Sequence, residues 1–195
     1  MSAVVTRRDL LAALGLGFGG LALGVVDAHA LEPVGPVGPR IDPASAAEEA
    51  RAPGLNPNVF LHVATDGQVT IVCHRSEMGQ GVRSTIPVLL ADELGADLSR
   101  VVVRQAEGDA KYGDQNTDGS SSIREPYESL RRAGATARVM LVAAAARRWK
   151  VEPATCTTRA HQVVHPPTGR TLRFEELVEA AAKLRVPENA PLRPF

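Results

Sequence analysis

The alternation of hydrophobic and polar residues predicts a strand hairpin in the middle of the chain. The apolar runs "VFLHVA" (59–64) and "QVTIVC" (68–73) flank Asp66-Gly67. Asp-Gly between two such runs is typical of a two-residue hairpin turn, because glycine adopts positive φ without a steric cost. A further strand is predicted over residues 100–106, "RVVVRQA",.

Helical periodicity appears in residues 82–95 and 124–149. The second segment places small and apolar residues on one face: Leu130, Ala133, Ala137, Met140, Leu141 and Ala144. This face predicts close packing against another element. Pro87 fits the first segment only near its first turn or with a kink. Beyond them the pattern predicts a short strand pair at 156–165, a turn at Pro166–Gly169, a helix at 174–184 and an extended end. Together these elements predict an α+β fold, a mixed sheet with flanking helices.

The N-terminal residues predict an export signal. Arg7 and Arg8 precede an apolar segment, residues 10–26, that is rich in glycine and shorter than the ~20 residues needed to span a bilayer,. With "AHA" at Ala28–Ala30, residues 1–30 are typical of a twin-arginine signal with a cleavage site, and cleavage itself stays open. The proline-rich residues 31–58 predict a linker, so we expect one folded domain over 59–195.

Composition narrows the function classes. Lys+Arg and Asp+Glu number 22 each and aromatic residues make up 4%, so neither a basic face nor a base-stacking platform for nucleic acid is expected,. Cys73 and Cys156 are too few for a disulfide scaffold, and one disulfide between them stays open. His62, His74, His161 and His165 lack a metal-ligand spacing and are expected as surface or cross-strand residues,.

Pairs of like charges on the predicted helices are expected to be solvated. We expect Asp92-Glu93 to lie on an exposed face of the first helix, and the arginines at 131–132 and 147–148 to coat the long one,.

Two polar segments follow predicted strands and precede predicted helices. The first, here called the glycine loop, is "EMGQG" (Glu77–Gly81). Free N–H groups at a helix start favour anions. Gly79 and Gly81 lack Cβ atoms, and Gln80 offers both a donor and an acceptor. These residues predict a backbone open to a ligand.

The second segment, here called the hydroxyl loop, is "QNTDGSSSIREP" (Gln115–Pro126). Thr117, Ser120 and Ser122 supply hydroxyl groups, which predicts a phosphate or a polar heterocycle as the ligand. The alternative for either loop is ordinary turn and helix-cap chemistry, which favours the same residue types.

The two loops, followed by "RRAGATAR" at 131–138, resemble the molybdopterin-binding subunits of the xanthine oxidase family, and those of isoquinoline 1-oxidoreductase-like enzymes in particular. The resemblance covers about residues 55–185 and the signal. It implies that Gln80, Thr117, Ser120 and Ser122 contact the pterin and its phosphate tail, with backbone from Gly79, Gly81 and Ser121. Molybdenum would be held by the cofactor, in its cytosine dinucleotide form, and the chain would supply no metal ligand.

The resemblance also implies an activity and partners. The reaction would be hydroxylation of an aldehyde or an N-heterocyclic carbon in the periplasm, with membrane contact only during export and electrons passed to a small [2Fe–2S] subunit. The rest of the molybdopterin subunit would be a partner, and this chain alone would be inactive. The family's catalytic base is a glutamate, and no catalytic residue is assigned here, because none of five glutamates matches its motif: Glu77, Glu93, Glu107, Glu125 and Glu128. Asp118 stands where relatives have a loop richer in glycine, and its negative charge would weaken phosphate binding unless the side chain points outward,. The alternative is a non-catalytic exported domain or a truncated remnant without cofactor.

Overall fold

A mixed five-stranded sheet forms the centre of the fold in the computed structural model, which describes residues 40–41 and 52–194. Its strand order is β1-β5-β4-β3-β2. The strands are β1 (Arg40–Ile41), β2 (Gly54–Asn58), β3 (Leu61–Ala64), β4 (Val69–Cys73) and β5 (Val101–Gln105). β1 and β4 run parallel to β5, whereas β2 and β3 continue the sheet as antiparallel strands. The predicted α+β class with a mixed sheet is confirmed.

The predicted hairpin forms between β3 and β4, but its turn is longer than expected. The N–H of Gly67 donates to the carbonyl of Ala64, and the N–H of Ala64 donates to Gln68, each at 2.8 Å. Thr65, Asp66 and Gly67 therefore form a three-residue loop, with Gly67 at φ 87°. A type I turn followed by a left-handed glycine accommodates the strand twist as the two-residue turn would.

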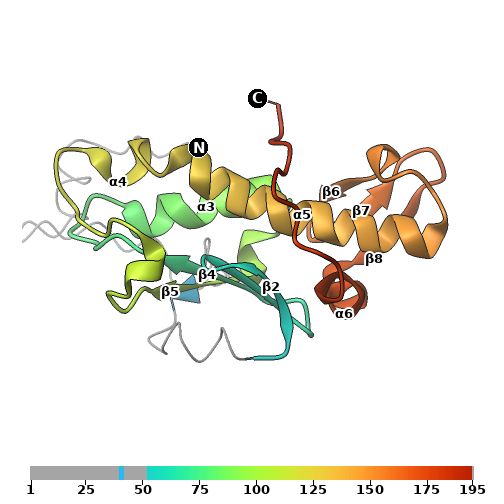
Figure 1. The fold of residues 1–195 in the computed structure, drawn as a ribbon, viewed down its shortest axis with the longest axis horizontal. Coiled ribbons are helices and arrows are strands. Elements are labelled where there is room, and N and C mark those ends of the chain that lie inside the picture. Colours follow the sequence, from blue (N-terminus) through green and yellow to red (C-terminus); the bar gives the residue numbers. More distant parts are fainter. Residues whose placement is uncertain (1–39, 42–51, 195) are drawn as a thin grey trace, which may run out of the picture. The chain divides into compact units, whose positions relative to one another are not determined.

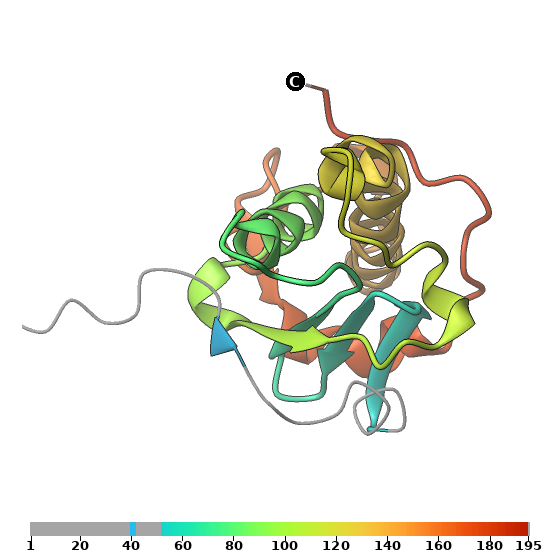
Figure 2. The same ribbon diagram turned by 90° about the vertical axis from the view of Figure 1, so that its left-hand side faces the viewer.

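Two helices cover one face of this sheet (Figures 1 and 2). α3 (Val82–Leu94) and α5 (Tyr127–Trp149) lie side by side, and Figure 2 looks almost along both of them. The predicted apolar face of α5 is buried against α3 and the sheet. It meets the apolar residues of the strands, among them Val63, Ile71 and Val103, each of which is fully shielded from solvent. This shared core fixes the position of the loops that lead into the helices.

A smaller sheet lies near the C-terminal end of α5 (Figure 1). It has the order β6-β7-β8, from β6 (Thr157–Arg159), β7 (Gln162–His165) and β8 (Arg170–Arg173). Only a strand pair was predicted here. The helix expected over 174–184 is the 3-10 turn η4 (Phe174–Glu176) followed by α6 (Val178–Ala182). Three further 3-10 turns are η1 (Leu98–Arg100), η2 (Ala110–Tyr112) and η3 (Pro153–Thr155), and α4 (Ser121–Arg124) is a single helical turn.

Two strands of the sheet, β1 and β2, lie before the predicted boundary at Val59. β2 occupies residues 54–58, and its Leu55 is 1% exposed in the core. Pro57, one of the prolines that suggested a linker, is compatible with β2 because β2 is an edge strand with a shifted register between Leu55 and Asn58,. The predicted export signal lies outside the described residues, as does most of the predicted linker.

Several side chains expected at the surface are buried instead. Glu93 and Arg131 pair between α3 and α5, which makes the expectation of solvated faces wrong for these two residues. The four histidines expected on strands are also buried rather than exposed. The rings of His62 and His165 hydrogen-bond to residues nearby in the sequence, that of His161 lies 2.7 Å from the distant Gly67 O, and that of His74 stacks on Phe60. Cys73 is buried and Cys156 half-buried, and both thiols are free. Within residues 52–194, no helix has the length and apolar character needed to cross a membrane.

Candidate functional site

The parallel pairing of β4 with β5 brings the glycine loop and the hydroxyl loop together. The pairing ends at Cys73 opposite Gln105, and the N–H of Ala106 still donates to Cys73 O at 2.9 Å. Parallel neighbours end at the same edge of a sheet, and ligands of α/β units bind outside the carboxyl ends of strands. The chain leaves β4 directly into the glycine loop, and it leaves β5 towards the hydroxyl loop.

Glu77 caps the start of α3 from within the glycine loop. Its Oε1 accepts hydrogen bonds from the N–H groups of Gly79 (2.7 Å) and Gly81 (3.0 Å), and its Oε2 accepts one from Arg83 (2.9 Å). These bonds, that from Arg83 foremost, lower the pKa of the Glu77 carboxyl. N–H groups at this helix start were expected to be free for a ligand, and for Gly81 and Arg83 the structure corrects that expectation.

The side chain of Gln80 is folded onto its own loop. Its Oε1 accepts from the N–H of Met78 at 2.6 Å, and its Nε2 donates to Ser76 O at 2.8 Å. One N–H of the amide and one lone pair of its oxygen remain for another partner. Gly79 and Gly81 have φ values of 97° and 84°. Such values strain any residue with a Cβ, so the turn itself accounts for both glycines.

The hydroxyl loop turns tightly between Asp118 and Ser121. The N–H of Ser121 donates to Asp118 O at 2.9 Å, and φ is positive at both central residues, Gly119 (48°) and Ser120 (56°). This is the geometry of a type I′ turn, and it costs a residue other than glycine about 1–2 kcal/mol. The hydroxyl of Ser121 also donates to Asp118 O at 2.9 Å, so Ser121 stabilises the turn.

Direct hydrogen bonds join the hydroxyl loop to Ser76, the residue immediately before the glycine loop. The N–H of Ser76 donates to Thr117 Oγ1 at 3.0 Å, and the Thr117 hydroxyl donates back to Ser76 O at 3.1 Å. Arg75, which is 2% exposed, reaches across as well, with Nη1 3.1 Å from Asp114 Oδ2. The hydrogen bond from Asn116 N–H and the nearby Arg75 charge lower the pKa of Asp114. The second loop is therefore held against the first by both neutral and charged contacts.

A cavity of about 350 Å³ opens between the loops. Four of its polar lining residues were predicted as site residues: Gln80, Thr117, Ser120 and Ser122. Met78, Val82 and Ile123 form an apolar part of the wall, and the Met78 side chain is 71% exposed. Asp118 also lines the cavity, and no lysine, arginine or histidine is among its described lining residues. Such a cavity suits a flat polar ring with one apolar face.

The structure does not bring every predicted residue to the cavity wall. Gly79, Gly81 and Ser121 lie in the two loops but are not among the described residues that line the cavity. Sequence reasoning missed Arg75 and Glu77, which hold the loops in place. The polar residues directly after β4 were the available signal for both. Among the described residues, no cluster of three or more histidine, cysteine, aspartate or glutamate side chains could hold a metal ion.

Comparison with known proteins identifies the family. The molybdopterin cofactor-binding domain family matches residues 37–193, and the chain belongs to this family. The resemblance inferred from the loops is thereby confirmed. The beta chain of isoquinoline 1-oxidoreductase from Brevundimonas diminuta is 38% identical over 160 residues, which are 76% of this chain and 20% of that protein.

Other relatives cover similarly small parts of longer proteins. A nicotinate dehydrogenase subunit from Pseudomonas putida is 28% identical over 97% of this chain and 15% of its own length. A protein of Gluconacetobacter polyoxogenes named membrane-bound aldehyde dehydrogenase [pyrroloquinoline-quinone] is 32% identical over 64% of this chain and 16% of its own length. The solved structure of quinoline 2-oxidoreductase from Pseudomonas putida 86 shares the fold, with a TM-score of 0.51 and 19% identity over 63% of this chain and 15% of that one. The chain thus spans about a fifth or less of the length of these relatives.

Proposed function

We propose that this chain holds part of the molybdopterin cofactor of a molybdenum hydroxylase in the cavity between the glycine loop and the hydroxyl loop. The observation that carries the proposal is the meeting of Gln80 with Thr117, Ser120 and Ser122 around one cavity. These four residues come from two loops more than thirty positions apart in the sequence. Family membership alone would not require them to face the same space.

The residues present fit a pterin and its phosphate. A volume of about 350 Å³ lies within the ~300–1,000 Å³ of typical small-molecule sites. Hydroxyl groups of Ser120 and Ser122 can donate to phosphate oxygens, and the spare donor and acceptor of Gln80 suit the nitrogen-rich edge of a pterin. The thioether of Met78 can lie against a ring. A bound cofactor would supply the molybdenum chemistry, and the role of this chain would be to bind and orient it.

The finer parts of the proposal come from the names of the relatives, the family resemblance and the predicted export signal. Oxidation of N-heterocycles or aldehydes as the reaction of the whole enzyme is supported by the names of three relatives: isoquinoline 1-oxidoreductase, nicotinate dehydrogenase and aldehyde dehydrogenase. Two of these relatives are named as subunits, which supports an assembly with other chains. A small [2Fe–2S] subunit, the cytosine dinucleotide form of the cofactor and export to the periplasm complete the proposal.

A second function has one specific observation in its favour. Asp118 lines the cavity, no cationic side chain among the described lining residues offsets it, and Glu77 already occupies N–H groups at the start of α3. A carboxylate beside a phosphate weakens binding unless it turns away. These features favour an exported domain that retains the fold without binding the cofactor.

The content of molybdenum and pterin in the purified protein distinguishes the two functions. The chain is purified alone and together with candidate partner subunits, and both contents are measured per mole of chain. Pterin retained in either preparation supports cofactor binding. Its absence from both would leave the non-catalytic domain as the better account.

A further inference from the structure

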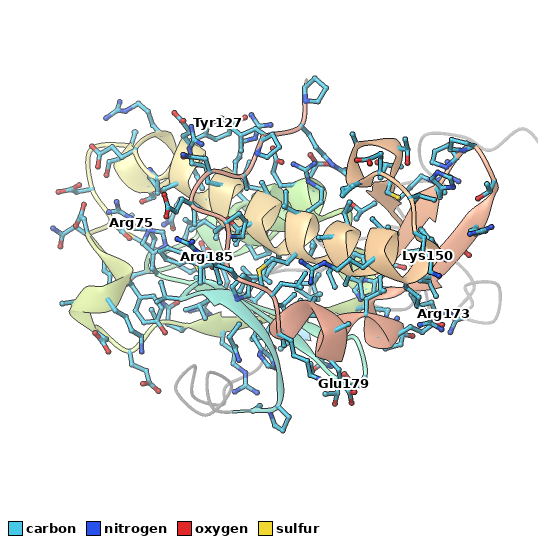
Figure 3. The ribbon with its side chains drawn as sticks, turned by 45° about the vertical axis from the view of Figure 1, so that its right-hand side comes forward. Arg75, Tyr127, Lys150, Arg173, Glu179 and Arg185 are labelled. Carbon is cyan, nitrogen blue, oxygen red and sulfur yellow. The ribbon has the colours of Figure 1, made fainter. Side chains whose placement is uncertain are left out.

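Arg75 connects the end of β4 to both ends of the hydroxyl loop. Its Nη1 contacts Asp114 Oδ2 at 3.1 Å, and it donates a hydrogen bond to Asn116 O. Its Nη2 lies 3.9 Å from Oε2 of Glu125. Asp114 immediately precedes the hydroxyl loop and Glu125 is its penultimate residue, so one guanidinium spans the loop. Figure 3 shows Arg75 at the same end of the molecule as this yellow segment.

The backbone of Arg75 is itself fixed to the sheet. Its carbonyl accepts hydrogen bonds from Cys73 Sγ (3.3 Å) and from Gln105 Nε2 (3.4 Å). The Gln105 amide also donates to Cys73 O at 3.0 Å and accepts from Arg83 Nη2 at 2.8 Å. Because β4, β5 and the start of α3 share these bonds, Arg75 projects from the rigid part of the fold.

The first part of the hydroxyl loop, up to Ser120, has little apolar packing of its own, whereas Ile123 further on packs against the core. Most of the residues from Gly113 to Ser120 are exposed. The ends of the segment border a second cavity of about 240 Å³, which Arg75, Asp114 and Glu125 line. A loop that borders cavities rather than core depends on its polar contacts for order. Of these contacts, those of Arg75 involve the most deeply buried side chain.

We infer that Arg75 is a positioning residue that sets the separation of the hydroxyl loop from the glycine loop, and with it the shape of the cofactor cavity. This inference rests on the proposed function for its consequence in binding, but not for its effect on the loop. Arginine suits the task because one arm of its planar fork, Nη1, contacts Asp114 and Asn116 O while the other, Nη2, points to Glu125,. Lysine would keep the charge and lose the fork.

The loop effect is tested in the full 195-residue chain without cofactor. Backbone order parameters from NMR are compared for wild type, Arg75→Met, Arg75→Lys and the control Arg170→Met, whose side chain is exposed on β8. In Arg75→Met we expect the order parameters of residues 113–122 to fall from ~0.85 to below ~0.6, while those of α3 and α5 stay unchanged. The loop order parameters of Arg75→Lys should lie between those of wild type and Arg75→Met. Those of Arg170→Met should match wild type. An ordered loop in Arg75→Met, or a loss of order throughout the fold, would overturn the inference.

The consequence for binding is tested by titrating the same variants with molybdopterin. We expect a Kd at least about tenfold higher for Arg75→Met, as for residues that orient direct ligands of a bound group. A disordered loop with an unchanged Kd would contradict the inference. If wild type binds no molybdopterin, the proposed function fails, and the NMR comparison still decides whether Arg75 positions the loop.

Discussion

The carboxylate of Glu93 and the guanidinium of Arg131 form a buried ion pair between α3 and α5. Arg131 Nε donates to Glu93 Oε1 at 2.6 Å, and the two residues are only 7% and 1% exposed. Arg138 Nη2 lies 3.4 Å from Glu93 Oε2, and the N–H of Arg193 donates to the same oxygen at 3.1 Å. Glu93 therefore ties both helices to the C-terminal segment.

Removing this buried charge should destabilise the fold strongly. Glu93→Gln leaves two arginines without their anion in a shielded environment, which costs about 3–5 kcal/mol of the free energy of unfolding. Chemical denaturation measures the loss. The neighbouring Asp92 side chain is exposed, so Asp92→Asn should change stability by no more than about 0.5 kcal/mol. Equal effects of the two substitutions would show that Glu93 is not the centre of the network.

Gly134 permits the close approach of α5 to α3. A Cβ at this position would lie 2.5 Å from Leu90 O and 2.9 Å from Glu93 Cβ. Helix propensity alone predicts that Gly134→Ala stabilises the protein by about 0.5–1 kcal/mol. Overpacking predicts the opposite, a loss of about 1–3 kcal/mol. We expect a loss in thermal unfolding, and the sign of the change decides between the two effects.

His161 should make stability depend on pH. Its Nε2 lies 2.7 Å from Gly67 O, and the N–H of Asp97 donates to its Nδ1 at 3.1 Å, which requires the neutral ring. Burial, foremost, lowers the pKa of His161 below its ordinary value. The unfolded chain therefore binds this proton at a higher pH than the native protein. The contribution of the neutral His161 ring to the free energy of unfolding is complete above about pH 6.5. It is lost as the pH falls through the lowered pKa of the native protein.

Urea unfolding of wild type and His161→Gln between about pH 5 and pH 7.5 measures this contribution. Arg100, Glu175 and Asp97 also act on the ring electrostatically and are unchanged in the variant. We expect wild type to lose stability on acidification more steeply than His161→Gln. Parallel curves would mean that His161 titrates alike in the folded and unfolded chains.

Export can be tested apart from the cofactor. If residues 1–30 form a twin-arginine signal, replacing Arg7 and Arg8 by lysine should leave the protein in the cytoplasm. Cell fractionation with an antibody against the chain gives the result. Unchanged export of the double variant would contradict the twin-arginine assignment, and Arg147→Lys serves as the matched control on an exposed part of α5.

Local patterns predicted most of the elements but not the contacts between them. Alternation predicted β3 and β4, and helical periodicity predicted α3 and α5. β8 was missed because it is four residues long and three of them are exposed. The burial of Glu93 depends on an arginine from another helix, so the charge pattern of α3 alone predicted an exposed face. Such pairs are set by tertiary packing and leave no periodic signal.

For the candidate site too, the sequence predicted the local residues but not the contacts that hold them in place. The residue types of the two loops predicted a polar binding cavity, and four of the named side chains meet there. These side chains meet because β4 and β5 pair in parallel, with α3 as the connection between them. A right-handed strand–helix–strand unit at this place in the sequence would have predicted that pairing. The polar residues after β4 indicated that Arg75 and Glu77 could matter, but their particular roles depend on loop geometry rather than on a motif.

Binding of molybdopterin to wild type and Ser122→Ala shows whether the cavity between the two loops holds the cofactor. Ser122 lines the cavity, whereas Ser84 is exposed on the first turn of α3 and does not line it, so Ser84→Ala is the matched control. If the cavity holds the cofactor, wild type and Ser84→Ala retain pterin, and Ser122→Ala binds it about tenfold more weakly because one hydrogen bond to a charged group is lost. Equal pterin binding by Ser122→Ala and wild type, or no binding by either, would contradict cofactor binding in this cavity.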